Sequence, residues 1–248
     1  MWEAGFWGLV GGSALVVGAA VGWFVRLPQR AIAAVMALGS GVLISAVAFD
    51  LMDEAYRSGG FAATAAGFGG GAAAYTLANI LLSRRGARHR KRSGHNAQEA
   101  QAGGGAGLAL AVGALLDGVP ESVVIGTSLL GGGGVGAVTV AAVFLSNVPE
   151  GLSSAAGMRR AGRGAGYVFG VWGGIAAASG LAAMIGFAAL HGVDAKITAG
   201  VTAVAAGAIL AMLVDTMIPE ATEATHEYAG LIAAAGFMIA FVLSTMES

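Results

Sequence analysis

An apolar run of the sequence is interrupted at Leu115-Leu116-Asp117-Gly118-Val119-Pro120-Glu121-Ser122 by two carboxylates and a proline. Asp117 and Glu121 are four residues apart, so on a helix they share one face. Pro120 has no backbone N–H, and its ring displaces the carbonyl of Leu116 from the helical hydrogen-bond pattern. This short segment therefore offers two carboxylates and one freed carbonyl oxygen, which are hard ligands suited to a cation.

A Pro-Glu pair returns twice further along the chain, with oxygen-bearing side chains ahead of it. The second copy is Ser146-Asn147-Val148-Pro149-Glu150-Gly151, and the third is Asp215-Thr216-Met217-Ile218-Pro219-Glu220. Three separate parts of the chain thus carry the same arrangement of oxygen ligands and a helix-perturbing proline.

The composition is that of a membrane protein. Of the 248 residues, 56% are hydrophobic and only 11% are charged. In a soluble domain, about a quarter of the residues are charged. The 43 glycines fit a bundle whose helices approach one another closely. The sequence has no cysteine, which excludes disulfides and thiolate metal sites.

Eight apolar runs reach the roughly 20 residues that a membrane-spanning helix needs. They cover about 5–25, 31–54, 60–83, 105–130, 134–158, 165–190, 196–220 and 228–246. The sequence therefore predicts an all-α, polytopic membrane protein with eight transmembrane helices, in which residues 1–248 form a single transmembrane transporter domain.

Basic residues gather in alternate connections of this predicted topology. They are Arg26 and Arg30 after the first helix, a cluster within 84–104 after the third, and Arg159, Arg160 and Arg163 after the fifth. The positive-inside rule places these connections in the cytoplasm and both termini outside it, in a cytoplasmic membrane. A basic run can also bind nucleic acid, but a topology signal explains the connection 84–104 better, so we expect no nucleic-acid partner.

Acidic pairs also close two of the predicted helices. Asp50 and Glu54 end the second helix, and Asp215 and Glu220 end the seventh. These matching ends suggest an internal inverted repeat, a feature of transporters whose sites lie near the middle of the membrane. A structural role near the headgroups remains the alternative for Asp50 and Glu54.

Carboxylates in mid-membrane need an explanation, because each costs about 2.5–3.5 kcal/mol at the centre of a helix. No lysine or arginine lies in the central part of a predicted helix to neutralise Asp117, Glu121 and Glu150. They are therefore protonated, line water or hold a cation, and we favour a transport path over structural hydrogen bonds. Asn147 and Ser146 could complete such a site or simply bridge helices.

These residues resemble the ZIP (zinc/iron-regulated-transporter-like) metal permeases over essentially the whole chain. The family carries His-Asn-x-Pro-Glu-Gly on its fourth helix, where this chain has Asp117-Gly118-Val119-Pro120-Glu121-Ser122. The fifth-helix pattern of bacterial members, Gln-Asn/Asp-x-Pro-Glu-Gly, is close to Ser146-Asn147-Val148-Pro149-Glu150-Gly151. The resemblance implies eight membrane helices, extracytoplasmic termini and a cytoplasmic loop between the third and fourth helices.

The chain departs from the family at the metal site. Asp117 and Gly118 replace a histidine and an asparagine, and Ala177 stands where many bacterial members have a glutamate. We therefore expect one main metal site of oxygen ligands, formed by Asp117, Glu121, Asn147 and Glu150. Oxygen ligands suit Mn, whereas the family favours Zn or Fe, so the substrate ion stays open among the three.

The expected function is import of a divalent metal ion by alternating access, with Asp50, Glu54, Ser146, Asp215 and Glu220 along the path. The alternative is a ZIP-fold protein without metal transport that carries protons or organic cations or acts as a membrane scaffold. No catalytic motif such as His-Glu-x-x-His is present, so no enzymatic activity is expected. The expected partners are the ion and the bilayer. The resemblance also makes a homodimer plausible, but the sequence does not choose between a dimer and a monomer.

Overall fold

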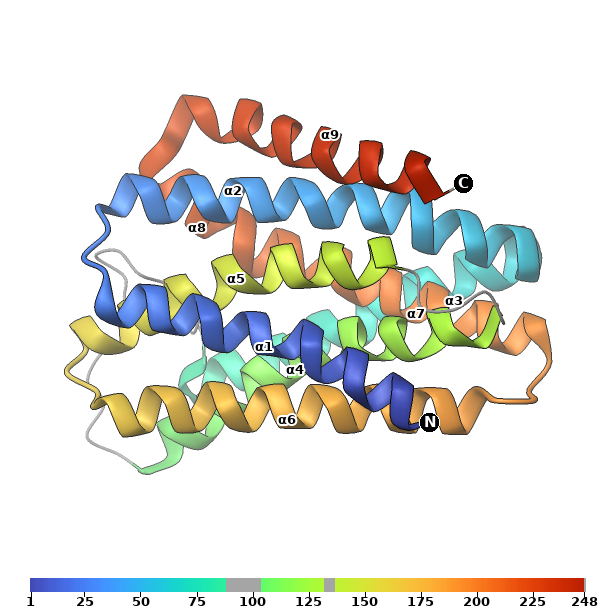
Figure 1. Cartoon of the computed structure of the whole chain (residues 1–248), viewed down its shortest axis with the longest axis horizontal. Coiled ribbons are helices and arrows are strands. Elements are labelled where there is room, and N and C mark those ends of the chain that lie inside the picture. Colours follow the sequence, from blue (N-terminus) through green and yellow to red (C-terminus); the bar gives the residue numbers. More distant parts are fainter. Residues whose placement is uncertain (88–103, 132–136, 248) are drawn as a thin grey trace.

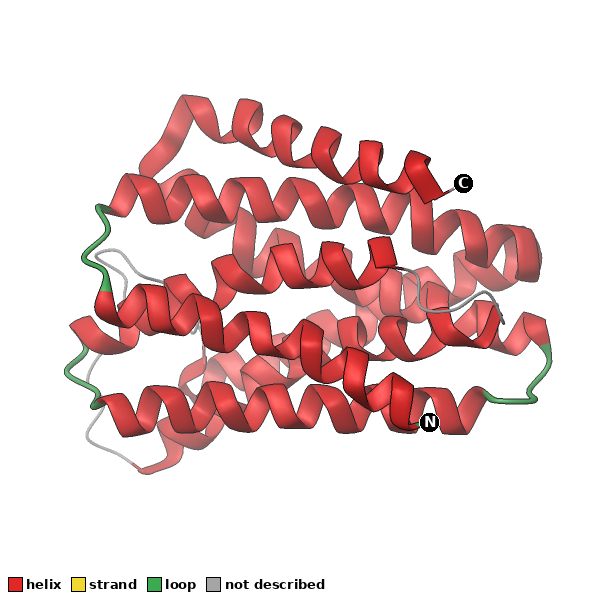
Figure 2. Ribbon diagram, in the orientation of Figure 1, coloured by secondary structure: helices red, strands yellow, loops and turns green. Residues whose placement is uncertain are grey.

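The computed structural model describes residues 1–87, 104–131 and 137–247, and these residues form helices without any strand (Figure 2). The α-helices are α1 Trp2–Phe24, α2 Gln29–Ser45, α3 Met52–Leu82, α4 Gly104–Ser128, α5 Ala137–Arg160, α6 Ala165–Leu190, α7 Ala195–Met212, α8 Ile218–Thr225 and α9 Ala229–Glu247. Short π-helical segments are η1 Ala46–Leu51, η2 Ser83–Ala87 and η4 Leu213–Met217, and 3₁₀ turns are η3 Leu129–Gly131 and η5 His226–Tyr228.

Two backbone reversals divide the longest helical stretches. The chain turns back inside α3 at Gly60, whose φ of 73° suits a residue without a Cβ. It turns again at His226, with a φ of 42°, between α8 and α9 (Figure 1). These breaks divide the described elements into eight rods, and each rod overlaps one of the eight apolar ranges. That each rod crosses a membrane stays a prediction.

Four helical stretches of the described chain are long and apolar enough to cross a membrane. Two are the single rods Trp2–Phe24 and Ala165–Leu190. The other two, Gln29–Arg85 with 57 residues and Ala195–Met246 with 52, contain the reversals and exceed twice the roughly 20 residues of one crossing. The helical, membrane-embedded character predicted from composition is confirmed at this level.

Two rods run further than the apolar pattern predicts. The second continues past residue 54 to the turn at Gly60, and an ion pair of 2.8 Å between Asp53 and Arg57 supports this extra turn. The seventh continues past residue 220 to Thr225 through α8. A helix predicted from hydropathy ends where polar residues begin. The backbone hydrogen bonds continue beyond that point, and an i,i+4 pair such as Asp53–Arg57 stabilises an exposed turn.

Glycines bring pairs of rods into backbone contact. A Cβ at Gly41 of α2 would lie 1.8 Å from the carbonyl oxygen of Ala233 in α9. A Cβ at Gly207 of α7 would lie 2.0 Å from the carbonyl oxygen of Phe68 in α3. The α2–α9 and α3–α7 pairs are therefore packed as closely as helices allow, which confirms the role predicted for the glycine content.

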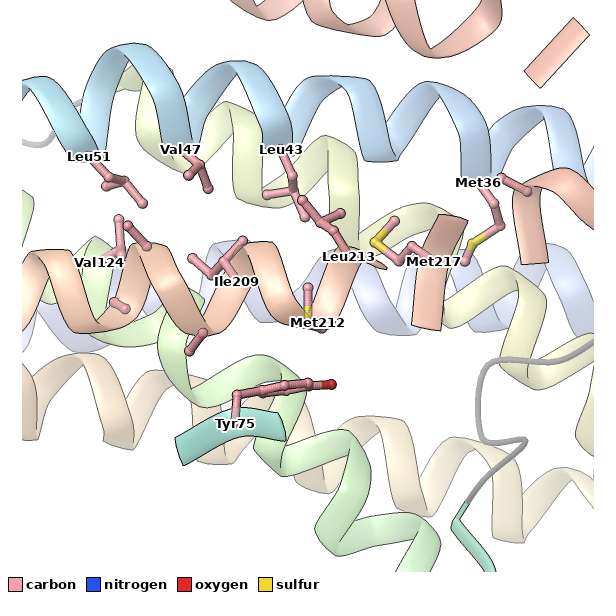
Figure 3. Close-up of a cluster of buried hydrophobic side chains, with 14 of the residues drawn as sticks. Met36, Leu43, Val47, Leu51, Tyr75, Val124, Ile209, Met212, Leu213 and Met217 are labelled. Carbon is pink, nitrogen blue, oxygen red and sulfur yellow. The ribbon is translucent and has the colours of Figure 1, made fainter. Parts of the chain in front are cut away.

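A buried apolar cluster joins α2, α3, α4 and α7 with their π segments (Figure 3). Met36, Met212 and Met217 are fully buried in it, together with Leu43 and Leu213. These methionines fill space in the core, as their flexible side chains allow. Tyr75 of α3 also belongs to the cluster, and its phenol leads to the site below.

Some predicted features fall outside the described residues. The basic connection 84–104 is described only as far as Ala87 and again from Gly104, where α4 begins. Residues 132–136, which hold most of the glycine-rich connection before α5, also lie outside the described ranges.

Candidate functional site

Glu121 and Glu150 lie at the same depth on two helices that contact each other. Gly11 of α1 contacts both helices, so the residues that it meets lie at one level of the bundle. A Cβ at Gly11 would lie 2.8 Å from the Ile125 side chain of α4. The Gly11 carbonyl accepts a hydrogen bond of 3.1 Å from Asn147 of α5. Since α4 and α5 run in opposite directions (Figure 1), one turn from Ile125 reaches Glu121 and one turn from Asn147 reaches Glu150. Glu121 is 1% exposed and Glu150 is 3% exposed.

Asp117 lies one turn further along α4 and is held by a tyrosine. The Tyr75 hydroxyl of α3 donates a hydrogen bond of 2.6 Å to Oδ1 of Asp117. Asp117 is 1% exposed, and Tyr75 is buried with it. This hydrogen bond holds the Asp117 carboxyl group in one orientation.

Asn147 presents an oriented oxygen acceptor. Its Nδ2 donates to the Gly11 carbonyl, so the position of its Oδ1 is determined by the planar amide group. No hydrogen bond reaches this Oδ1 from any residue that the structure describes, although the side chain is only 3% exposed. Buried acceptors are nearly always satisfied, so this oxygen is suited to a ligand such as a cation or water.

A polar face of α5 connects the middle of the bundle to its basic end. Ser146, Glu150 and Ser153 follow one another at spacings of four and three residues, and all three are buried. Ser153 donates a hydrogen bond of 3.0 Å to Oε1 of Glu220 on α8, which is also fully buried. The structure thereby brings Glu220 next to the α5 segment that carries Glu150.

Glu220 is also bound from the start of α2. The amide of Gln29 donates to Glu220 at 3.3 Å, and its oxygen accepts 2.8 Å from Arg160 at the end of α5. Together with Ser153, these contacts join α2, α5 and α8 at one point. Side-chain hydrogen bonds therefore connect three helices at the end of the bundle that carries the arginines.

The two aspartates of the predicted path both lie in π-helical segments. Asp50 of η1 is half-buried and accepts a hydrogen bond of 2.6 Å from Ser244 of α9. Asp215 of η4 is exposed and accepts a hydrogen bond of 3.1 Å from Asn79 of α3. Asp215 and Glu220 are thus not brought together, because one is exposed and the other buried. Isolated π turns within α-helices are frequent at functional sites.

Glu54 is exposed and lines a pocket of about 280 Å³ at the end of the bundle opposite the arginines. Its other lining residues include His191 in the α6–α7 connection, Thr127 of α4 and Thr198 of α7. Glu54 therefore lies in a hollow near the end of α4.

The charged ligands do not form a compact cluster. Among the described residues, no three histidine, aspartate or glutamate side chains are grouped closely enough to hold one metal ion. The expected set Asp117, Glu121, Asn147 and Glu150 is therefore distributed over neighbouring turns of two helices. A single ion could contact both helices only with oxygen from amides, hydroxyls, carbonyls or water completing its shell.

Helix α6 adds hydroxyl and apolar groups to the site. Ser179 and Ile175 face Gly118, where a Cβ would meet them at 3.7 and 3.9 Å. Ala177, which stands at the position of the family's glutamate, is exposed on the outside of α6. A Cβ at position 118 would thus be in ordinary van der Waals contact with α6, and no carboxylate is found on this helix.

The sequence reasoning missed three residues that contact the predicted site: Tyr75, Ser153 and Gln29. Ser153 could have been found, since it lies one turn from Glu150 on the same face of a helix. Tyr75 and Gln29 are 42 and 191 residues from their partners in sequence, so no local pattern indicates them.

The chain matches no family model and no curated protein.

Proposed function

We propose that this protein carries a divalent metal ion across a membrane, as the ZIP-like motifs imply, with Zn, Fe or Mn as its substrate. In this proposal the eight rods cross the membrane, the arginine-rich end faces the cytoplasm, and both termini lie outside it. The observation that carries the proposal is the burial of Glu121 and Glu150 at one depth, on two adjacent helices that each contain a proline.

Charge balance supports a cation at this depth. The three carboxylates Asp117, Glu121 and Glu150 would cost on the order of 8–10 kcal/mol if their individual costs simply added. The salt bridge between Asp53 and Arg57 lies far along the sequence from these three carboxylates. A divalent ion between α4 and α5 would neutralise them, with Oδ1 of Asn147 as a neutral ligand.

The path from this site to the cytoplasm would follow the polar face of α5. An ion held near Glu150 could pass Ser153 and reach Glu220, which contacts Ser153 directly. Opening would require the hydrogen bonds from Gln29 and Ser153 to Glu220 to break. Asp50 and Glu54 would serve the outer entrance, and Asp215 would remain at the exit face.

An internal inverted repeat is supported by matching contacts on opposite sides of the bundle. In each half a rod carries a π segment with an aspartate, Asp50 in η1 and Asp215 in η4. Each aspartate accepts a hydrogen bond from the neighbouring rod. Asp50 accepts from α9, which packs on α2 through glycines, and Asp215 accepts from α3, which packs on α7 through glycines. Because α2 and α7 run in opposite directions (Figure 1), the two halves are related by inversion, as in many transporters.

Proton or organic-cation transport is the second candidate. It is favoured by the distribution of the carboxylates, since no three of them are grouped in the described chain. The hydrogen bond from Tyr75 to Asp117 also gives one carboxylate a partner without any metal. A proton carrier would use the same buried carboxyl groups. Unlike a metal carrier, it would not require two of these groups to bind the same ion.

Metal stoichiometry of the purified protein separates these candidates. Elemental analysis and calorimetric titration with Mn, Zn and Fe(II) should find about one ion per chain, and Glu121→Gln and Glu150→Gln should each weaken binding by about tenfold or more, as loss of a charged ligand does. Glu3→Gln, at an exposed site on α1, should bind as the unchanged protein does. Absence of bound metal in the unchanged protein would favour the proton or organic-cation carrier.

A further inference from the structure

A pocket of about 540 Å³ lies at the arginine-rich end of the bundle, between the start of α2 and the turn that joins α8 to α9. Its size is within the range of small-molecule sites. Arg30 of α2 lines one part of it, and His226, Glu227 and Tyr228 of the turn line another. None of these residues belongs to the proposed ion path.

The pocket combines one cation and one anion that have no protein partner. Neither the Arg30 guanidinium nor the Glu227 carboxylate makes a salt bridge or hydrogen bond with any residue in the described ranges. Both side chains are exposed to the pocket, and they come from elements far apart in the sequence. A ligand that carries both a negative and a positive charge would pair with Arg30 and Glu227 together. A purely anionic ligand would be repelled by the Glu227 carboxylate.

The surface beside the pocket is apolar. Tyr228 is 68% exposed and Leu231, on the first turn of α9, is 73% exposed, while Ile232 lines the pocket itself. Tyrosine at the end of an apolar helix is typical of the headgroup layer of a membrane. A charged head in the pocket would therefore have a surface for hydrocarbon chains next to it.

We infer that this pocket binds the headgroup of a phospholipid that carries a phosphate and a primary amine, as phosphatidylethanolamine does. Arg30 binds the phosphate, because a guanidinium donates two parallel hydrogen bonds to phosphate oxygens. Glu227 accepts hydrogen bonds from the ammonium group, and the acyl chains lie along Tyr228 and Leu231. The inference requires a membrane around the bundle but does not depend on metal transport.

A bound lipid would also stabilise the arginine-rich end of the bundle. Arg30 follows Gln29, whose side chain contacts both Glu220 and Arg160. The headgroup would join the start of α2 to the α8–α9 turn at the same end. Its occupancy should therefore raise the thermal stability of the protein in detergent.

The test is lipid retention. Purified protein is exchanged into detergent with equal amounts of phosphatidylethanolamine, phosphatidylcholine and phosphatidylglycerol, and bound lipid is counted by native mass spectrometry. The ethanolamine lipid should be retained preferentially, and Arg30→Gln and Glu227→Gln should each reduce its retention by about tenfold, the effect of one charged hydrogen bond. Arg26→Gln, an exposed arginine outside the pocket, should retain it fully.

Three results would overturn the inference. The first is equal retention of all three lipids, or a preference for phosphatidylglycerol. The second is loss of retention in Arg26→Gln as large as in Arg30→Gln, which would indicate general attraction to the basic end. The third is equal thermal stabilisation by soluble phosphoethanolamine and by the lipid at the same concentration, which would assign the pocket to a water-soluble ligand. Metal binding measured on the same samples reports on the transport proposal separately.

Discussion

At the scale of single residues, each buried carboxylate has different surroundings. Asp117 has a phenol donor from another helix, Glu220 has a serine and an amide, and Glu150 shares its face of α5 with two serines. The identities of these acids could be predicted, because a carboxylate inside an apolar run is costly and therefore conspicuous. Their partners Tyr75 and Gln29 could not be predicted, since contacts between helices far apart in the sequence leave no periodic trace in it.

Replacing Tyr75 with phenylalanine tests the contact to Asp117. The change removes one hydrogen bond to a buried carboxyl group and leaves the ring in the core, so the free energy of unfolding should fall by about 1–3 kcal/mol. Thermal or denaturant unfolding in detergent measures the loss.

The matched control for that change is Tyr56→Phe, because Tyr56 is exposed and makes no hydrogen bond among the described residues. It should unfold like the unchanged protein. Equal stability of the two variants would show that the Tyr75–Asp117 hydrogen bond contributes nothing to the fold.

At the scale of elements, proline and glycine act differently from what their local preferences suggest. Pro120 and Pro149 lie inside α4 and α5, and neither helix is interrupted there. The reversal of the second stretch occurs at Gly60 instead, within a sequence that has 43 glycines. The sequence alone could place that turn only approximately, because most glycines serve close packing and a few serve positive φ.

Packing of α1 on α5 should be sensitive to a single methyl group. A Cβ at Gly18 would lie 2.1 Å from the carbonyl oxygen of Val148, next to Pro149 and Glu150. Gly18→Ala must therefore separate the helices and should cost about 1–3 kcal/mol of unfolding free energy, as overpacked cores do. Unfolding in detergent again gives the value.

Gly170→Ala on α6 is the control for the packing prediction, because nothing lies within 4 Å of a Cβ at that position. This variant should be as stable as the unchanged protein. If Gly18→Ala also unfolds normally, the close approach of α1 and α5 is wrong.

At the scale of the whole molecule, hydropathy predicts most of the architecture. Each of the eight apolar ranges overlaps one rod, although two rods extend beyond their ranges, because a helix that could cross a membrane must be apolar over most of its length. Which rods pack together could not be predicted, since all of them are apolar and glycine-rich. The pairs α2–α9 and α3–α7 depend on individual glycines that meet a carbonyl across the contact.

Orientation in the membrane can be tested with introduced cysteines, since the sequence contains none. In intact cells a membrane-impermeant maleimide should label Val193→Cys in the α6–α7 connection and leave Gly164→Cys in the α5–α6 connection unlabelled. Both positions are exposed, so accessibility within the protein does not differ. The reverse pattern would place the arginines outside the cytoplasm, against the positive-inside rule.

Transport itself is the direct test of the claim that buried carboxylates pass a divalent cation. The protein is reconstituted into liposomes that contain a metal-sensing dye, and uptake of Mn, Zn and Fe(II) is recorded for the unchanged protein, Glu121→Gln, Glu150→Gln and the surface variant Glu3→Gln. We predict uptake by the unchanged protein and Glu3→Gln and a loss of at least about tenfold in the two buried-site variants, as expected when a charged ligand is removed. Uptake that is equal in all four proteins, or no uptake in any, would contradict the account.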